Sequence, residues 1–397
     1  MKMQWRMLGL VAAMMLTACG QSGALNPNLA PNVSADADEF STMALAPMMG
    51  TDSDNNNEFP RQAPMPTPTG RKGQWLVFSN HNHTSYWDGV KPLTEAQSEV
   101  WLHNCDAMDL TDHDTMRGCQ SPEFLNPPHG LIMVKGMEWN AFREKGETVV
   151  GHAGLLGMDG YDPLPTNLSL NDMLNAATAR HATIIINHPF AFNCPWQQPV
   201  PDTRAQAIEV WNGWWAAADP LIHNDKALAW WNAALQKGEH FTAIGGTDCH
   251  GHFYQTYYKP VNMVFAETPD QAGILAGIRA GHVSISQTPT AARVFLEADP
   301  AGDGSFSAMM GDTVPHPANG TLTVRAIVLG GKGKNCVFYT AGGRVEIDSV
   351  KSDDATFTLK VKVRPGADYV RAEVRAHPHL FFSMSAISNP VYVAAGA

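Results

Sequence analysis

The sequence predicts an α/β fold whose strands form a β/α barrel, followed by a small antiparallel β-domain. Seven short apolar runs end one after another in histidines, acids or amides. Helical stretches with apolar residues about 3.6 apart alternate with these runs, and after Pro289 the pattern changes to period-two runs without helices between them. Strands whose carboxyl ends all carry polar groups are how a β/α barrel builds an active site.

The seven predicted barrel strands share one design, an apolar run that leads into side chains able to bind metals or substrates. They are Trp75–Ser79 before His81 and His83, Met108–Thr111 before Asp112 and His113, Leu131–Gly136 before Glu138, Thr148–Gly151 before His152, Ile184–Ile186 before His188, Ala207–Val210 before Trp211 and Asn212, and Phe241–Gly246 before Asp248 and His250. Side chains two apart on a strand share a face, so His81 with His83 and Asp248 with His250 are expected to enter one site.

Helices and later strands follow from the same periodicities. The predicted helices are Thr94–His103, Ser169–Arg180, Leu228–Lys237 and Gln271–Ala280. The predicted strands of the C-terminal domain are Leu322–Val328, Val345–Ile347, Thr356–Val363 and Val370–Ala376. Gly and Asp turns separate these strands, which favours an antiparallel domain of about 100 residues packed as a sandwich.

Composition limits the kinds of partner. A chain of 397 residues is long enough for one large domain and a smaller one around a sizeable core. Its formal net charge of −11 argues against non-specific binding to nucleic acid or to anionic lipid. We therefore expect a small-molecule substrate and no nucleic-acid partner.

The N-terminus resembles a bacterial lipoprotein signal. Lys2 and Arg6 form a basic region, Met7–Leu16 is apolar, and Cys19 stands at the lipobox position before Gly20. An ordinary secretory signal or a buried helix is the alternative. The prediction is a mature protein that begins at lipidated Cys19 and is anchored in the cell envelope on the periplasmic side. Gly20 gives no retention signal, which favours the outer membrane, and the lipid is the only membrane contact expected.

Residues 20 to about 72 are rich in Asn, Ala, Pro, Asp and Thr, a composition that cannot bury enough apolar surface to fold. The predicted organisation is therefore a signal peptide at 1–18, a disordered tether at 19–72, the barrel at 73–290 and the β-rich domain at 291–397.

Five cysteines remain after Cys19, an odd number that leaves at least one unpaired. Cys105 and Cys119 flank the second predicted strand and its following loop, so either a disulfide between them or two reduced thiols fits the pattern. Cys249 lies between Asp248 and His250 and alternates to the opposite face, where we expect it to pack. The sequence has no Cys-x-x-Cys, which argues against a thiolate zinc site.

Histidine is concentrated in the predicted barrel, where 13 of the 16 histidines fall between His81 and His282. Any one of them alone is more often a structural side chain than a ligand. Nine suitable groups in order at successive strand ends, however, indicate a metal site. Imidazole nitrogen mixed with carboxylate oxygen suits Zn²⁺, Mn²⁺ or Fe²⁺ better than Ca²⁺ or Mg²⁺.

These motifs resemble the PHP (polymerase and histidinol phosphatase) family over residues 73–290. The motifs are His81-x-His83-Thr84, Asp88-Gly89, Asp112-His113, Gly136-Met-Glu138-Trp139, Gly151-His152, Asn187-His188-Pro189 and Gly246-Thr-Asp248-Cys-His250. Further features are similar to the CehA/McbA-like branch, namely Glu209-Val-Trp-Asn212, Gly281-His282 before Ser284-Ile-Ser286, and Ile387-Ser-Asn-Pro-Val391. The resemblance implies a distorted seven-stranded β/α barrel with two or three divalent metals at its carboxyl end.

The resemblance also implies which residues hold each metal. The first metal would be bound by His81, His83, Glu138 and Asp248, the second by Glu138, His152 and His188, and the third by Asp88, His113 and His250. Glu138 would bridge the first two metals, and Glu138, Asp248 and His282 are the implied catalytic residues. His282 would protonate a leaving group if it reaches the site, and a structural His is the alternative.

Other side chains near the predicted strand ends carry weaker expectations. Asp112 is expected to orient neighbouring histidines, Asn212 to face the substrate and Glu209 to be structural. Five tryptophans, Trp211, Trp214, Trp215, Trp230 and Trp231, are expected to pack in the barrel wall rather than to form an aromatic platform for substrate.

The predicted function is a multi-metal-dependent hydrolase that uses a metal-bridging hydroxide. A phosphoester is the first candidate substrate. A carbamate, amide or ester is the alternative, since the same nucleophile attacks either centre. A non-catalytic envelope binding protein with structural metals is a second alternative of a different class.

Overall fold

The computed structural model describes residues 64–140, 151–198, 201–215, 219–378 and 383–396. The predicted signal peptide, Cys19, the predicted tether as far as residue 63, and residues 148–150 of the fourth predicted strand lie outside these ranges. Among the described residues, no helix combines the length and hydropathy needed to cross a membrane.

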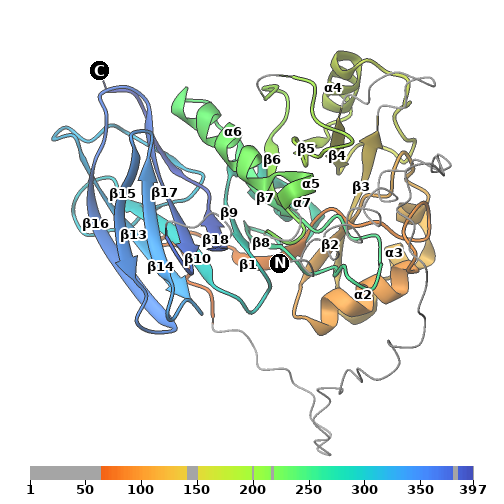
Figure 1. Cartoon of the computed structure of the whole chain (residues 1–397), viewed down its shortest axis with the longest axis horizontal. Coiled ribbons are helices and arrows are strands. Elements are labelled where there is room, and N and C mark those ends of the chain that lie inside the picture. Colours follow the sequence, from red (N-terminus) through yellow and green to blue (C-terminus); the bar gives the residue numbers. More distant parts are fainter. Residues whose placement is uncertain (1–63, 141–150, 199–200, 216–218, 379–382, 397) are drawn as a thin grey trace, which may run out of the picture. The chain divides into compact units, whose positions relative to one another are not determined.

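The first half of the described chain alternates strands with helices (Figure 1). Its strands are β1 (Gln74–Ser79), β2 (Ala107–Leu110), β3 (Ile132–Asn140), β4 (His152–Leu156), β5 (Thr183–Asn187), β6 (Ala207–Asn212) and β7 (Thr242–Gly246). Its helices are α2 (Leu93–Leu102), η2 (Gly118–Gln120), α3 (Pro122–Leu125), η3 (Pro128–Gly130), α4 (Leu170–Ala179), α5 (Asp219–Ile222), α6 (Asn224–Gln236) and α7 (Gln271–Ala280).

Local sequence signals explain where the longer helices begin and end. The Ser169 hydroxyl accepts from Asp172 N–H at the start of α4, and the Asp270 carboxylate accepts from Gly273 N–H at the start of α7. Helix α7 ends at Gly281, whose φ of 74° is in the left-handed region that favours glycine. These caps fix the helices between strands that are wholly buried, such as β5.

Strands β1 to β7 are neighbours in chain order in one sheet. Strands β1, β2 and β3 run parallel, as do β5, β6 and β7. At the ends of this series, β7 approaches β1: Thr247 N–H donates to Asn80 O (2.8 Å), and Asn82 forms a parallel bridge with Cys249. The seven-strand α/β architecture predicted from the sequence is therefore confirmed.

The fourth strand differs from the prediction in position and direction. Strand β4 begins at His152 instead of ending before it, and it pairs antiparallel with both β3 and β5. His152 is therefore at the amino end of its strand. Because β4 is reversed, that end lies beside Asn140 and Asn187 at the carboxyl ends of β3 and β5, so His152 still lies at the edge predicted for it.

The second half of the described chain is antiparallel, apart from one short parallel pair between Thr313–Val314 and Val391–Val393. Its strands are β8 (Val261–Ala266), β9 (Val283–Ser286), β10 (Arg293–Asp299), β11 (Ala308–Met309), β12 (Thr313–Val314), β13 (Thr321–Leu329), β14 (Asn335–Thr340), β15 (Gly343–Ser349), β16 (Asp354–Lys362), β17 (Asp368–Arg375), β18 (Met384–Ser388) and β19 (Val391–Val393). Strands β10, β11, β13 and β16 form a separate four-stranded sheet.

The remaining late strands continue the first sheet. Strand β8 pairs with β1, β9 pairs with β8, and β18 pairs with β9. Short period-two runs do not reveal such long-range pairing, and the sequence pattern alone predicted a separate C-terminal β-domain. A core that includes Trp75, Phe265 and Phe295 packs between the two sheets, with the Trp75 ring 5.4 Å from Phe265 and 4.7 Å from Phe295.

Residues 64–72, the last part of the predicted tether, belong to the folded unit. Met65 packs against the core, Trp75 Nε1–H donates to Pro66 O (2.8 Å), and Arg71 forms an ion pair with Asp312. For the cysteines, Cys105 and Cys119 are both buried free thiols, so the reduced alternative holds. Cys249 is also buried, as expected of a packing residue.

Candidate metal centre

All nine predicted ligands come together at the carboxyl edge of β1–β7, around the carboxylate of Glu138. Glu138 is wholly buried in β3, and its two oxygens face different groups of histidines. Oxygen Oε1 lies 3.1 Å from His81 Nε2, 3.2 Å from His152 Nδ1 and 3.1 Å from His188 Nε2. Oxygen Oε2 lies 3.3 Å from His83 Nε2 and 3.2 Å from His113 Nδ1.

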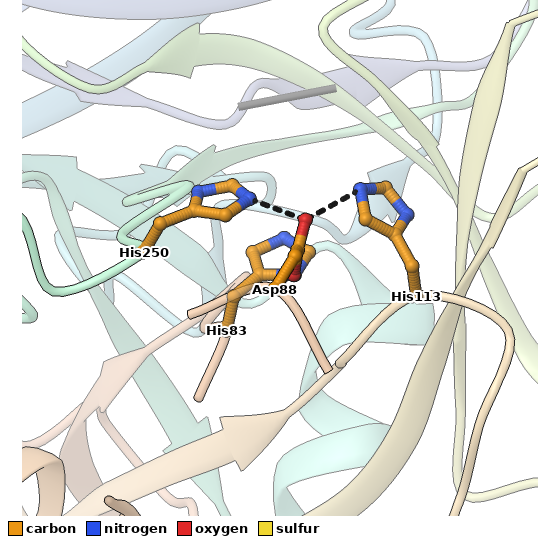
Figure 2. Close-up of side chains that lie close together, drawn as sticks. All are labelled: His83, Asp88, His113 and His250. Atoms are coloured by element: carbon orange, nitrogen blue, oxygen red, sulfur yellow. Dashed lines mark hydrogen bonds and ion pairs between the residues drawn. The ribbon is translucent and has the colours of Figure 1, made fainter. Parts of the chain in front are cut away.

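A second carboxylate, that of Asp88, lies among three histidines on the other side of the centre (Figure 2). Its Oδ2 lies 3.1 Å from His250 Nε2 and 3.6 Å from His113 Nε2, and its Oδ1 lies 3.4 Å from His83 Nδ1. In Figure 2 the three imidazoles surround this carboxylate from separate loops. The structure thus adds His83 to the predicted group of Asp88, His113 and His250.

Asp248 completes the group around His81. Its Oδ1 lies 3.4 Å from His81 Nε2 and 3.5 Å from His83 Nε2. His81, His83, Glu138 and Asp248 are therefore close enough to share one cation, which is the set expected for the first metal. The set expected for the second metal, Glu138, His152 and His188, is also assembled at Glu138 Oε1.

Several of these ligands have an unusual backbone conformation, with a positive φ angle. Residues His81 and Asp248 have φ of 67° and 48°, and His188 has φ of 22°. Such values are uncommon for residues with a Cβ, and they cluster at functional sites where the surrounding structure enforces them. Strands β1 and β7 end at Ser79 and Gly246, so the paired ligands follow the strands on turns rather than alternating along them.

The charges in the centre shift its pKa values strongly. Burial alone would raise the pKa of Glu138, but positive charge on His81, His113 and His152 outweighs it and holds that pKa well below its usual range. Burial lowers the pKa of His113 to about 3, although the charge of Glu138 opposes this shift. Burial would also lower the pKa of His188, but its hydrogen bond to Glu138 raises that pKa to about 9.

Buried polar atoms in the centre lack hydrogen-bond partners among the described residues. They are His81 Nε2, His83 Nδ1 and Nε2, His113 Nδ1, Asp88 Oδ1 and Glu138 Oε2. Leaving such atoms unpaired in a folded interior costs free energy. Imidazole nitrogens and carboxylate oxygens that face one another in this way fit divalent cations between them, so these residues fit the predicted metals.

Glu209, which was expected to be structural, directly supports the centre. Its buried carboxylate contacts His81 Nδ1 through Oε1 (2.9 Å) and accepts from His188 N–H through Oε2 (2.7 Å). A Cβ on Gly246 would lie 1.4 Å from Glu209 Oε1, so glycine at that position leaves the room that the carboxylate needs. Sequence reasoning had no signal for this contact because it forms only when β6, β7 and the end of β1 meet.

Other polar side chains hold the ligand loops in place. Asp112 accepts from Thr84 N–H (2.6 Å) and from the Thr84 hydroxyl (2.8 Å), so it fixes the turn after His83 instead of orienting a histidine ring. Asn187, which the sequence reading did not single out, donates to Glu138 Oε1 (2.8 Å). Asn212, which was predicted to face the substrate, donates to Asp248 Oδ2 (3.2 Å) and so contacts a predicted ligand.

Asp109, a further residue missed from the sequence, accepts from His81 N–H (3.0 Å) and from Asn82 Nδ2 (2.9 Å). It is fully buried in β2, and burial raises the pKa of its carboxyl to about 7.

His282 does not reach the centre, so its predicted catalytic role is wrong. Its main-chain oxygen accepts from Phe265 N–H, and Phe265 pairs with Trp75 at the start of β1. The His81 side chain lies beyond the other end of β1, about 20 Å further along at the usual rise per strand residue. The His282 ring instead contacts Asp312, with Nε2 and Oδ1 separated by 3.1 Å.

The tryptophans behave mostly as expected. Trp211, Trp215 and Trp231 are buried in the barrel wall, and Trp230 packs on the same core. Trp214 is exposed, and its ring lies 4.9 Å from Lys259 Nζ.

Known proteins share little sequence with this chain. No protein-family model matches the chain, and no curated protein matches its sequence. One similar solved structure is a two-domain protein from Bacteroides vulgatus that contains a predicted PHP-like metal-dependent phosphoesterase; it has 16% identity and a TM-score of 0.47, and the match covers 84% of this chain and 100% of that one.

Two further solved structures match smaller parts of the chain. A candidate metal-dependent phosphoesterase from Bifidobacterium adolescentis has 13% identity and a TM-score of 0.35, with 48% of this chain and 94% of that one covered. An amidohydrolase from Chromobacterium violaceum with bound sulfate has 15% identity and a TM-score of 0.33, with 46% and 90% covered. At these values the likeness carries no argument about activity.

Proposed function

We propose that this protein is a multi-metal-dependent hydrolase whose first candidate substrate is a phosphoester. The observation that supports the proposal is the set of buried imidazole and carboxylate atoms that face one another around Glu138 without hydrogen-bond partners. Structural metal sites close their coordination with one set of ligands, whereas here adjacent sets share a carboxylate. That arrangement favours catalysis over a purely structural role.

Each part of the centre has a role in this proposal. His81, His83, Glu138 and Asp248 would hold one cation, His152 and His188 a second with Glu138, and Asp88, His113 and His250 a third. When bound, such cations activate water near neutral pH and stabilise negative charge that develops on the substrate. Glu138 fixes the spacing of the two histidine groups because its oxygens contact both. Asn212, which donates to Asp248, limits the rotation of that carboxylate.

A carbamate, amide or ester is the second candidate substrate, and one observation favours it. The segments 84–90, 189–198, 213–223 and 251–258, which follow β1, β5, β6 and β7, contain no Lys or Arg. Phosphoryl-transfer sites commonly use cationic side chains in addition to metals to neutralise the phosphate. A neutral carbonyl compound makes no such demand on these loops.

The test is metal titration of the purified chain with a panel of chromogenic phosphodiester, phosphomonoester, carbamate and ester substrates. We expect turnover of at least one class with Mn²⁺, Zn²⁺ or Fe²⁺, and loss of turnover in Glu138→Ala and His188→Ala. His316→Ala, which changes a half-buried histidine of the C-terminal region whose ring contacts Arg364 O, is the matched control and should retain activity. Full turnover in the two centre variants would contradict the mechanism, and no turnover with any metal would favour a binding protein.

We also propose that the chain is a lipoprotein of the cell envelope, anchored through Cys19 and otherwise free of the membrane. The support is the basic and apolar segment before the lipobox-like residues 16–20. Labelling of expressing cells with a fatty-acid analogue should mark the parent chain and not Cys19→Ser. Equal labelling of both chains would contradict the anchor.

A further inference from the structure

We propose that four exposed aromatic side chains around the metal centre, Trp87, Phe192, Trp214 and Phe253, bind a large, uncharged, apolar group of the substrate beside the bond that is cleaved. We name these residues the aromatic arc. The inference rests on the proposed hydrolase function and adds the chemical class of the substrate to it.

The four residues lie on loops that directly follow β1, β5, β6 and β7, at the edge of the sheet that carries the metal centre. Trp87 precedes Asp88, Phe192 is four residues after His188, and Phe253 is three residues after His250. Trp214 is two residues after Asn212, which donates to Asp248. Each loop therefore begins at the metal centre, and its exposed ring follows within a few residues.

Contacts between the loops join them in a continuous series. Val90 N–H, in the loop of Trp87, donates to His250 O (2.8 Å). The loop of His250 continues to Lys259, whose Nζ lies over the Trp214 ring. Phe192 N–H donates to Leu221 O (2.8 Å), which joins the loop after β5 to the segment that follows Trp214. These contacts join the four loops around the metal centre, although the residues of the arc are spread over more than 160 positions from Trp87 to Phe253.

The four rings of the arc are exposed to solvent and free to contact a ligand. The exposed fractions are 58% for Trp87, 72% for Phe192, 49% for Trp214 and 89% for Phe253. Rings this exposed add little to folding, because the hydrophobic free energy depends on the area removed from water. Exposed apolar side chains that gather in one place mark binding sites. Among the described residues, the other exposed aromatic side chains are Trp101 and Tyr161.

Charge selects the kind of ligand. The loops that carry the arc contain no Lys or Arg between residues 84 and 90, 189 and 198, 213 and 223, or 251 and 258. Lys259 follows the last of these segments, and its ammonium group faces the Trp214 ring. Beside the first segment, Lys91 pairs with Glu99 and Arg117 Nη2 donates to Tyr86 O, so these two cations already have partners in the chain. An anionic group held away from the metals would have to compete for them. An uncharged apolar group, by contrast, gains free energy from each ring it covers.

The experiment compares benzyl and methyl members of each substrate class, because the two leaving alcohols differ little in acidity and the ring is the main difference. With the metal-loaded full chain we expect kcat/KM to favour the benzyl member by about tenfold or more, mainly through KM. Phe253→Ala and Phe192→Ala should each lower the benzyl-to-methyl ratio at least about threefold. Trp101→Ala, an exposed ring near the end of α2, is the control and should leave the ratio unchanged.

The outcomes separate this proposal from the hydrolase proposal. An unchanged ratio in both phenylalanine variants overturns the aromatic arc while hydrolysis stands. If neither member of any pair is hydrolysed, the hydrolase proposal fails. In that case the two phosphonates are compared as ligands. Tighter binding of benzylphosphonate than of methylphosphonate, lost in Phe253→Ala, would still support the arc. Equal binding of the two would overturn it. A parent chain that sediments with phosphatidylglycerol vesicles, a Phe253→Ala variant that does not, and an unchanged benzyl-to-methyl ratio of kcat/KM would together make the arc a membrane contact. That result would overturn the proposal.

Discussion

The histidines around Glu138 differ widely in pKa when no metal is bound. Burial favours neutral rings, yet the carboxylates raise the pKa of His81 and His83 well above the ordinary value and that of His188 to about 9. His113 shifts the other way, to about 3. At neutral pH several of these rings therefore carry protons at atoms that a metal would need, so protons and metals compete for the same positions.

The first prediction follows from this competition. Because the raised pKa values keep His81, His83 and His188 protonated at neutral pH, metal binding should release protons, and metal affinity should increase as the pH rises towards about 9. Isothermal titration calorimetry in buffers of different ionisation enthalpy measures the number released. An uptake of protons, or an affinity that falls with rising pH over this range, would contradict the assigned charges.

The second prediction concerns Glu209, which contacts His81 Nδ1 and accepts from His188 N–H. His81 Nδ1–H and the main-chain N–H of His188 both need an acceptor. In Glu209→Gln the amide has only one oxygen, so one of these two groups faces an NH₂ group instead. Partners behind a metal-binding histidine typically contribute about 10- to 100-fold to metal affinity. We expect a loss of that size, measured by competition with a chromogenic chelator, together with a lower kcat.

The control for Glu209→Gln is its stability without metal. If the variant unfolds at the same denaturant concentration as the parent while losing metal affinity, Glu209 acts by positioning the ligands. Unchanged metal affinity and kcat would show instead that its contacts with His81 and His188 are dispensable.

The residue-scale predictions from the sequence succeeded where the ligand pairs are local and failed where the partner is distant. His81 with His83 and Asp248 with His250 converge as expected, although turns rather than strand alternation bring them together. The role of Glu209 depends on contacts between three separate strands, and the position of His282 depends on which strand β9 joins. Neither contact leaves a periodic signal in the sequence.

Among the elements, β17 links the two halves of the fold through a buried charge cluster. Glu373 accepts from Arg371 Nη1 and Arg375 Nε, each at 2.6 Å. The Arg371 guanidinium also lies 5.3 Å from the ring of Trp231 in α6 and 4.4 Å from the ring of Tyr339 in β14. One strand therefore contacts both a helix of the α/β region and strand β14 of the C-terminal region.

The third prediction is that Glu373→Gln destabilises the protein by about 3 to 5 kcal/mol at neutral pH, because it removes the buried negative charge that both Arg371 and Arg375 contact. The arginine charges hold the pKa of Glu373 below its usual value against the opposing effect of burial. This contribution is therefore present above a pH of about 4.3, the pKa of an unfolded Glu, and is lost as the pH falls through the lower folded value.

Denaturant unfolding at pH 7 and at pH 3 tests this pH dependence. The difference in the free energy of unfolding between the parent and Glu373→Gln should be smaller at pH 3. Glu346→Gln on β15 changes an exposed carboxyl and should alter stability by less than about 0.5 kcal/mol. A difference that grows on acidification would mean that the cluster is not stabilised by the charge of Glu373.

The direction and continuity of elements were harder to predict than their positions. An apolar run before a histidine fits a strand that ends there, yet β4 begins at His152 and runs antiparallel. The same edge is reached because a reversed strand presents its amino end beside the carboxyl ends of its neighbours. Periodicity shows which faces are buried, and it does not show which way a strand runs or which strand it joins.

For the whole molecule, the metal centre should act as a cross-link as well as a catalytic site. Its ligands come from β3, β4 and the segments after β1, β2, β5 and β7, and several carry buried polar atoms without partners. A cation that binds the folded chain and not the unfolded one stabilises it by about 2.7 kcal/mol at a concentration 100 times its Kd. In a folded unit that spans residues 62–397, each kcal/mol raises Tm by about 1.5 °C.

The fourth prediction is that Mn²⁺ or Zn²⁺ at such a concentration raises Tm by about 4 °C over the chelator-treated protein, as measured by differential scanning fluorimetry. Ca²⁺ should shift Tm less, since imidazole-rich sites discriminate against it. In Glu138→Ala the shift should fall because both groups of histidines lose their shared carboxylate. Equal shifts in the parent and Glu138→Ala would mean that the metals bind elsewhere, since the only change is at the centre of the ligand cluster.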